Sequence, residues 1–153
     1  MSLYCAGIRT FLQQVQKVIE KESLMSKSWM VLIAGPYRSG TGDDPRKIEA
    51  NLAKLEAAAL EIWNRGHLPV IGEWMAVPLV KRAGSQVMGD AIWQSMVYPV
   101  ADRLLEHCDA VLRLPGASKG ADGDVSLART LGLPVVTALE QLPVASPQKG
   151  RPL

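Results

Sequence analysis

Four short apolar runs, separated by longer segments of helical periodicity, organise the chain from Trp29 onward. The runs are "WMVLIAG", "LPVI", "DAVLRLP" and "LPVVTA", which start at residues 29, 68, 109 and 133. Their apolar residues are continuous rather than alternating, which is typical of strands buried on both faces of a parallel sheet. Because helical segments separate the runs, right-handed crossovers place helices on both faces. The pattern predicts an α/β fold with a parallel sheet of four to five strands.

Capping signals mark the ends of the first long helix. Asp44 is a favourable N-cap residue, and Pro45 suits the first helical position. Apolar residues then recur at intervals of three and four, the stripe of an amphipathic helix, at Ile48, Leu52, Leu55, Ala59 and Ile62. Gly66 is a natural residue to end the helix.

Three further segments are predicted to be wholly or partly helical. We expect residues 73–83 to form a short helix or an irregular segment. Residues 88–107 have a helical pattern, with a break or restart at Pro99. The last long helix is expected over "DVSLARTLG", which begins at Asp124 and is capped by Gly132.

The N-terminal part stands apart from this alternating pattern. Within residues 1–28, apolar residues at helical spacing predict one amphipathic helix. This helix packs on the domain or on a partner chain, or it is a non-essential extension. The α/β domain is predicted to cover residues 29–143, and the proline-rich residues 144–153 are expected to be a mobile tail. We expect the chain to form a homo-oligomer.

Composition narrows the classes of function. The chain has 153 residues, of which 48% are hydrophobic and 21% charged, and its formal net charge is +2. This small charge argues against nucleic acid and membrane partners, and no apolar run reaches the length of a membrane span. Cys5 and Cys108 lie far apart without metal or redox spacing, so we expect a reducing, cytoplasmic setting.

Two polar, glycine-containing loops follow strands and precede helices. They cover residues 35–44 and 115–124. Ligands of parallel α/β sheets bind beyond the carboxyl ends of the strands, where the strand order reverses. If the order is 2-1-3-4, the first and third strands are neighbours, and both loops border one crevice.

The first loop has residues suited to a small polar ligand. Gly35 permits a close approach to the backbone, Tyr37 has a flat face and a hydroxyl, and Arg38 can hold an anion by a bidentate contact. A flexible connection with solvated charges is the alternative. The loop lacks the Gly-Lys-Ser/Thr ending of a P-loop and the dinucleotide-binding glycine spacing.

The second loop leads into a helix. The amides of Ser118, Gly120 and Ala121 can form an anion-binding concavity. Asp122 and Asp124 lie in the loop or the first helical turn, where capping explains one aspartate well. Two acids exceed what capping needs.

Several other polar residues are weaker candidates. Asp102, Asp90 and Glu73 are possible site acids, although a solvated helix face explains each of them equally. His67 and His107 follow helix ends, which they are expected to stabilise. No cluster of His, Cys and Asp has metal-ligand spacing.

Three segments together resemble the nucleoside 2-deoxyribosyltransferase-like proteins. They are "IAGPYRS", "LEIWNRGHLPV" and "ADRLLEHCDAVLRLPGASKGADGDVSLARTLGLPVV", within residues 31–136. The most specific feature is Ser-x-Gly-Ala-x-x-acid after a strand that ends in a Leu-Pro-Gly turn. The resemblance implies a Rossmann-like, flavodoxin-type sheet that binds a nucleoside or nucleotide, with no cofactor.

The resemblance also implies roles for individual residues. Active members break an N-glycosidic bond: a glutamate attacks the anomeric carbon, and the glycosyl-enzyme intermediate passes to another base or to water. Asp124 occupies the position of this glutamate, Tyr37 would help to position the site, and Asp102 would contact the base or sugar. The implied binding residues are Gly35, Pro36, Arg38, Ser118, Gly120 and Ala121.

The aspartate at position 124 leaves the reaction type open. It is one methylene shorter than glutamate, and attack requires accurate placement. Either its helix lies closer to the substrate, or Asp124 works differently, or activity is lost. The first hypothesis is an enzyme of the N-glycosidic bond; the second is a nucleotide-binding module without catalysis; the third is a structural protein assembled through its N-terminal helix.

Overall fold

The computed structural model describes residues 12–15 and 27–145. Residues 12–15 are helical, and the rest of the predicted N-terminal helix lies outside the described residues. The predicted tail beyond Ala145 lies outside them as well. The division into extension, domain and tail therefore stays a prediction.

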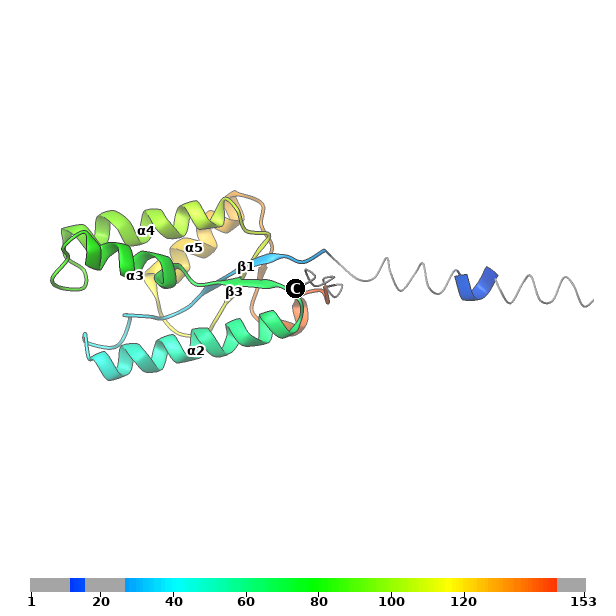
Figure 1. The fold of residues 1–153 in the computed structure, drawn as a ribbon, viewed down its shortest axis with the longest axis horizontal. Coiled ribbons are helices and arrows are strands. Elements are labelled where there is room, and N and C mark those ends of the chain that lie inside the picture. Colours follow the sequence, from blue (N-terminus) through cyan, green and yellow to red (C-terminus); the bar gives the residue numbers. More distant parts are fainter. Residues whose placement is uncertain (1–11, 16–26, 146–153) are drawn as a thin grey trace, which may run out of the picture.

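Four parallel strands form one sheet in the order β2-β1-β3-β4. The strands are β1 (Met30–Ala34), β2 (Leu68–Val70), β3 (Ala110–Arg113) and β4 (Val135–Val136). In the central pair, Val31 is opposite Ala110 and Leu32 is opposite Val111. The predicted α/β class is confirmed (Figure 1). The strand order is the 2-1-3-4 order that was the condition for one crevice shared by both loops.

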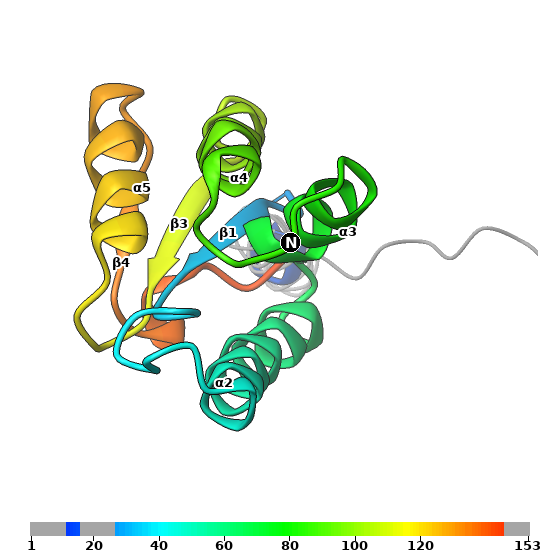
Figure 2. The ribbon, with the colours of Figure 1, turned by 90° about the vertical axis from the view of Figure 1, so that its left-hand side faces the viewer.

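Helices cover both faces of the sheet (Figure 2). Alternate residues of β1 point to opposite sides: Val31 and Ile33 pack with helix α2 (Pro45–Asn64), while Leu32 and Ala34 pack with the other core. The second core is covered by α4 (Ala91–Leu105) and α5 (Lys119–Thr130). The absence of polar alternation along β1 is explained by burial on both sides.

Helix α2 has the boundaries that its sequence predicts. The Asp44 carboxylate accepts a hydrogen bond from the backbone N–H of Arg46 at 2.9 Å, and Pro45 is the first helical residue. Gly66 follows the helix with a φ of 85°, in the region that favours glycine. Buried Leu55 and Ile62 of the apolar stripe each contribute about 1.5–3 kcal/mol to folding.

One of two predictions about the middle of the chain is corrected. Residues 73–83 were predicted to form a short helix or an irregular segment, and the structure has the short helix α3 (Gly72–Arg82), with Pro78 inside it. Helix α4 continues through Pro99, where a break was predicted. A proline inside a helix costs about 3 kcal/mol. Packing of α3 against α4, together with burial of Trp93, offsets this cost.

The predicted start of the last long helix is also wrong. Helix α5 begins at Lys119, five residues before Asp124, because Ser118 caps it by accepting a hydrogen bond from the N–H of Ala121 at 3.2 Å. Ala121, Val125 and Ala128 form its buried stripe. The two glycines in its first turns indicated a loop, but the cap and the stripe outweigh their unfavourable helix propensity.

His67 does not stabilise the end of α2 through its ring. The side chain is buried; its Nδ1 accepts from the N–H of Trp29 at 3.1 Å, and its Nε2 lies 2.5 Å from the carbonyl of Pro143. The ring therefore joins the start of β1 to the segment after η1 (Leu139–Gln141).

Candidate active site

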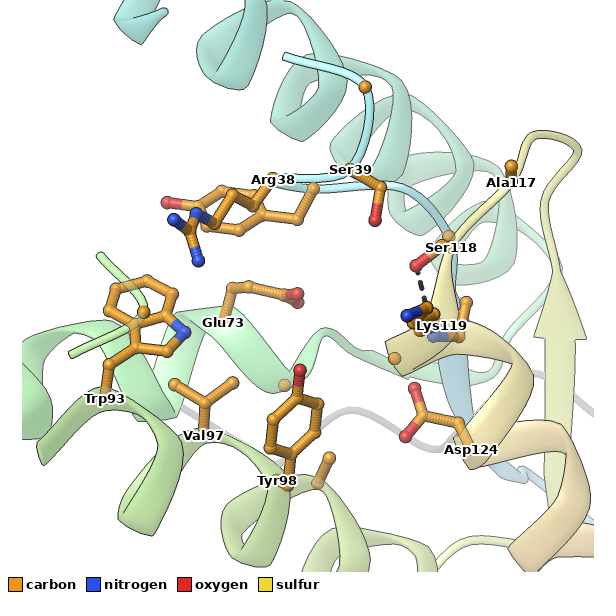
Figure 3. A pocket seen from close by; sticks show the side chains of 18 of the residues that line it. Arg38, Ser39, Glu73, Trp93, Val97, Tyr98, Ala117, Ser118, Lys119 and Asp124 are labelled. Atoms are coloured by element: carbon orange, nitrogen blue, oxygen red, sulfur yellow. Dashed lines mark hydrogen bonds between the residues drawn. The ribbon is translucent and has the colours of Figure 1, made fainter. Parts of the chain in front are cut away.

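A cleft of about 800 Å³ opens at the carboxyl ends of β1 and β3. Both predicted loops line it, together with the first turn of α3 and one face of α4 (Figure 3). The β2-β1-β3-β4 order explains this convergence, because β1 and β3 are neighbours and the chain leaves them in opposite directions across the sheet.

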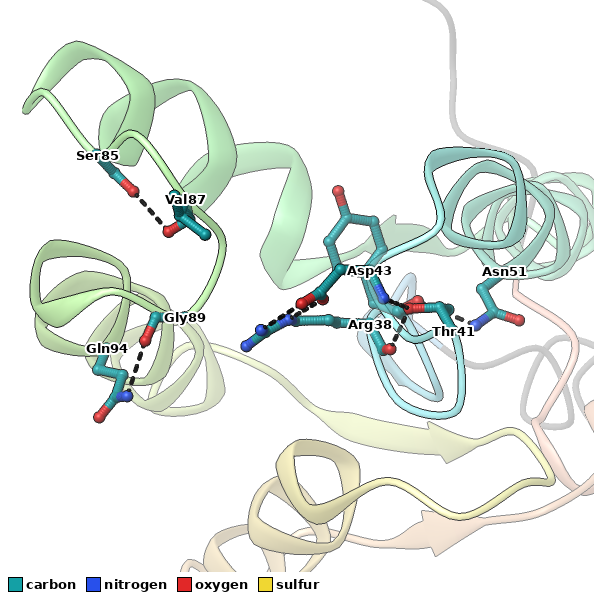
Figure 4. Close-up of polar contacts among 9 residues, drawn as sticks. Arg38, Thr41, Asp43, Asn51, Ser85, Val87, Gly89 and Gln94 are labelled. Atoms are coloured by element: carbon teal, nitrogen blue, oxygen red, sulfur yellow. Dashed lines mark hydrogen bonds and ion pairs between the residues drawn. The ribbon is translucent and has the colours of Figure 1, made fainter.

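The loop after β1 is held by specific hydrogen bonds. The buried hydroxyl of Thr41 donates to the carbonyl of Arg38 at 2.6 Å and accepts from the N–H of Asp43 at 3.2 Å (Figure 4). Asn51 of α2 donates from Nδ2 to the carbonyl of Tyr37 at 2.9 Å. These contacts favour an ordered loop over the alternative of a flexible connection.

Arg38 reaches from this loop toward the turn between α3 and α4. Its Nε and Nη2 donate to the two carboxylate oxygens of Asp43 at 2.5 and 2.9 Å (Figure 4). This pair holds the pKa of the Asp43 carboxyl below its usual value. The guanidinium also lies against Gly89. A ligand anion at Arg38 would therefore share the guanidinium with Asp43.

The turn between β3 and α5 is fixed by Arg113. Its guanidinium donates to the carbonyls of Leu114 and Gly116 and forms an ion pair with Asp122 at 2.8 Å. Asp122, one of the two acids noted in the sequence, is therefore the exposed partner of Arg113 and does not line the cleft.

The N-terminus of α5 forms one wall of the cleft. Ser118, Lys119, Gly120 and Ala121 all line it. The first N–H groups of a helix have no partner within the helix, and the helix dipole favours negative charge at this end. The Ser118 hydroxyl already accepts a hydrogen bond from one of these N–H groups, that of Ala121. The remaining N–H groups of the first turn can donate to a ligand.

Two carboxylates enter the cleft from opposite walls. Asp124 lies in the second turn of α5, and Glu73 lies in the first turn of α3. Figure 3 shows both side chains directed into the cleft, with Tyr98 beside them. Within the described part of the chain, neither carboxylate forms an ion pair.

The electrostatics of this acid pair are unusual. Burial raises the pKa of Asp124 to about 7, and the negative charges of Glu73 and Asp102 add to the effect. Burial also raises the pKa of Glu73 and, with the charge of Glu73, the pKa of Tyr37. A carboxyl group titrating near neutral pH can carry or release a proton during a reaction.

One face of α4 adds an aromatic and apolar wall. Trp93, Gln94, Val97, Tyr98 and Ala101 line the cleft from this helix. Residues 94, 97, 98 and 101 recur at intervals of three and four, which is the signal that could have identified Tyr98 from the sequence.

Glu73 is a cleft residue that the sequence indicates only weakly, as one of three possible site acids with Asp90 and Asp102. Asp90 instead caps α4, where its carboxylate accepts from the N–H of Trp93 at 2.8 Å. The signal for Glu73 is its position just after β2, at the same sheet edge as the two loops.

The structure brings most of the predicted site residues together. Those that line the cleft are Gly35, Tyr37, Arg38, Ser118, Gly120, Ala121 and Asp124. Pro36 and Asp102 are not among the described lining residues. Pro36 borders a separate cavity of about 380 Å³, and Asp102 is exposed on α4, near enough to Asp124 to affect its pKa.

Residues 12–15 and 27–145 contain no group of three His, Cys, Asp or Glu side chains that could hold a metal ion. Of the helices in those same ranges, none combines the length and the apolar character that crossing a bilayer requires.

Comparison with known proteins bears on the fold. The sequence matches no protein-family model and no curated relative. Among solved structures it is similar to a 2-deoxyribosyltransferase from the psychrotolerant bacterium Bacillus psychrosaccharolyticus, with a TM-score of 0.51, 16% sequence identity and 69% of each chain covered. The chain therefore shares the α/β parallel-sheet fold of a 2-deoxyribosyltransferase, as the resemblance of its sequence segments implied.

Proposed function

We propose that this protein is an enzyme of the N-glycosidic bond of nucleosides or nucleotides, either a deoxyribosyltransferase or an N-glycoside hydrolase. The observation that carries the proposal is the convergence of Glu73 and Asp124, two carboxylates without ion pairs in the described structure, in one cleft. Paired carboxyl groups on either side of a scissile bond are the groups that glycoside cleavage uses. The fold is that of an enzyme described as a biocatalyst for the synthesis of nucleosides.

The rest of the cleft suits the parts of such a substrate. Its volume of about 800 Å³ lies within the range of small-molecule sites. Tyr98 and Trp93 offer aromatic surface for a base. The N-terminus of α5, with Lys119 and with Arg38 across the cleft, offers donors for a sugar hydroxyl or a 5′-phosphate. Asp124 lies beside these donors and acts on the glycosidic bond, as nucleophile or as proton donor.

The test is release of free base. The full chain is incubated with deoxyribonucleosides, ribonucleosides and their 5′-monophosphates, with and without adenine as acceptor, and products are separated by chromatography. We expect base release from at least one class, and a drop of about 100-fold or more in Asp124→Ala. Glu61→Gln, an exposed carboxylate on α2, is the control. Absence of base release from every class would overturn the proposal.

One observation favours a second function, a nucleotide-binding module without catalysis. Position 124 has an aspartate, whereas the glycosyl-transferring relatives implied by the sequence resemblance have glutamate. Calorimetric binding of a nucleotide without base release would support this alternative. The homo-oligomeric state and the cytoplasmic setting stay predictions from the sequence.

A further inference from the structure

The two cleft carboxylates occupy different positions in their helices. Glu73 is the second residue of α3, where the helix dipole stabilises negative charge. Burial raises the pKa of Glu73, and its own backbone N–H, which donates to its carboxylate, opposes this rise. Asp124 is the sixth residue of α5, beyond the turn whose N–H groups are free. The backbone therefore favours a charged Glu73 and gives no such support to Asp124.

The groups around each carboxylate favour the same division. Asp124 faces negative charge from Glu73 on α3 and from Asp102 on α4, and both oppose its ionisation. Arg113 acts in the other direction, but its guanidinium is already bonded to the β3–α5 turn and to Asp122. Two carboxyl groups that share a site do not both ionise easily, so the pair retains one proton near neutral pH.

Five further ionisable groups line the same cleft: Tyr37, Tyr98, Lys119, and Arg38 and Asp43, which form an ion pair with each other. Tyr37 faces Glu73 from the loop after β1, Tyr98 reaches in from α4, and Lys119 lies at the start of α5. Both tyrosine hydroxyls can donate a hydrogen bond. They can hold the ionised carboxylate in place without neutralising it.

We propose that Glu73 supplies the ionised carboxylate of the reaction and that Asp124 supplies the proton. Glu73, although it lies on a different helix, would then have the role of the glutamate that is absent from position 124. This assignment rests on the proposed function and specifies its two catalytic residues. Asp124 is one methylene shorter than the glutamate of the family, but this does not prevent its role, because a proton donor does not need to reach the anomeric carbon.

The chemistry balances in two steps. First, a Glu73 carboxylate oxygen bonds to the anomeric carbon while the carbon–nitrogen bond breaks; its electron pair goes to the base, which takes the proton of the Asp124 carboxyl. Then water, or the nitrogen of an acceptor base, bonds to the anomeric carbon. The ester bond breaks, its electron pair returns to Glu73, and the proton released by the attacking group passes to Asp124.

A substrate whose leaving base needs no proton separates the two roles. The full chain, Glu73→Gln and Asp124→Asn are compared on 2′-deoxyguanosine and on its 7-methyl derivative, whose base already carries a positive charge, with spontaneous cleavage subtracted. We expect Glu73→Gln to lose about 100-fold or more on both substrates. In the first turnover, before the second step needs Asp124 as a proton acceptor, Asp124→Asn should release base about 100-fold more slowly from the first substrate but less than about 10-fold more slowly from the second.

Three other results of this activity comparison would contradict the assignment or the proposed function. The reverse selectivity, with Asp124→Asn inactive on both substrates and Glu73→Gln rescued by methylation, would overturn the assignment. A Glu73→Gln variant as active as the Glu61→Gln control would overturn it too. If the parent cleaves neither substrate nor any other nucleoside, the proposed function fails. That result is distinct from the two outcomes above, in which the parent is active but the assignment of roles is wrong.

A measurement without turnover tests the proton's position directly. Carboxyl ¹³C resonances of the labelled full chain, assigned with Glu73→Gln and Asp124→Asn, report which group is protonated at pH 6. We expect Asp124 to be protonated and Glu73 ionised, and we expect Glu73→Gln to shift the Asp124 titration to lower pH. An ionised Asp124 beside a protonated Glu73 would contradict the proposal even if no substrate were known.

Discussion

The guanidinium of Arg38 lies against the backbone of Gly89, so that the loop after β1 meets the turn between α3 and α4 at the cleft. A Cβ atom at position 89 would come within 2.1 Å of Arg38 Nη1. Both residues line the cleft. The position of a cationic side chain therefore depends on the absence of a side chain in another loop.

Replacing Gly89 with alanine should displace Arg38 and weaken the binding of a nucleoside 5′-monophosphate by about 10-fold, because a charged hydrogen bond is lost. Gly84→Ala is a matched control: both glycines have a positive φ, 85° and 94°, but no atom lies within 4 Å of a Cβ at position 84. Both variants should lose about 1–2 kcal/mol of stability from the left-handed backbone. Equal nucleotide affinities by calorimetry would contradict a role for the Arg38–Gly89 contact.

The raised pKa of Asp124 predicts a stability that depends on pH. Its carboxyl titrates near 7 in the folded chain against 3.8 ordinarily, so the folded state binds the extra proton between these values. Stability from this group is complete below pH 4 and is lost as pH rises through 7. Asp124→Asn should be more stable than the parent at pH 8, by on the order of 2 kcal/mol, and the difference should shrink at pH 5. Urea unfolding at both pH values measures the stability difference between Asp124→Asn and the parent. If that difference did not change with pH, the raised pKa of buried Asp124 could not be its cause.

The hydroxyl of Thr41 should be needed to hold the loop after β1. Thr41→Val keeps the shape of the side chain but leaves the N–H of Asp43 without its acceptor. We expect a loss of about 1–2 kcal/mol in the free energy of unfolding, with faster amide hydrogen exchange across residues 38–44. Thr137→Val, at an exposed position, provides the comparison. Unchanged exchange in the loop would show that other contacts order it.

The buried ring of His67 should contribute strongly to stability. His67→Phe removes the acceptor for the Trp29 N–H and the partner of the Pro143 carbonyl, so we expect a loss of about 2–4 kcal/mol. His107→Phe changes an exposed ring and should cost less than about 0.5 kcal/mol. Thermal or urea unfolding compares the two, and similar losses would rule out a special role for the His67 bonds.

Local sequence determined the sheet and its direction. Continuous apolar runs such as 29–35 specify strands that are buried on both faces, and the helical stripes between them make the strands parallel. Asp44 and Pro45 fixed the start of α2, because a cap acts through its immediate neighbours. The same local signals placed Tyr37, Ser118 and Asp124 at the edge of the sheet where they meet.

Only the tertiary structure decided where α4 and α5 run and which two carboxylates meet in the cleft. Helix α4 runs through Pro99, and α5 includes two glycines, because packing against the sheet outweighs propensity in each case. The pairing of Glu73 with Asp124 could not be predicted from spacing, since 51 positions separate them and their charges interact through space. Whether such a carboxylate is a solvated surface acid or a proton carrier depends on burial and on nearby charge, and the folded chain alone sets both.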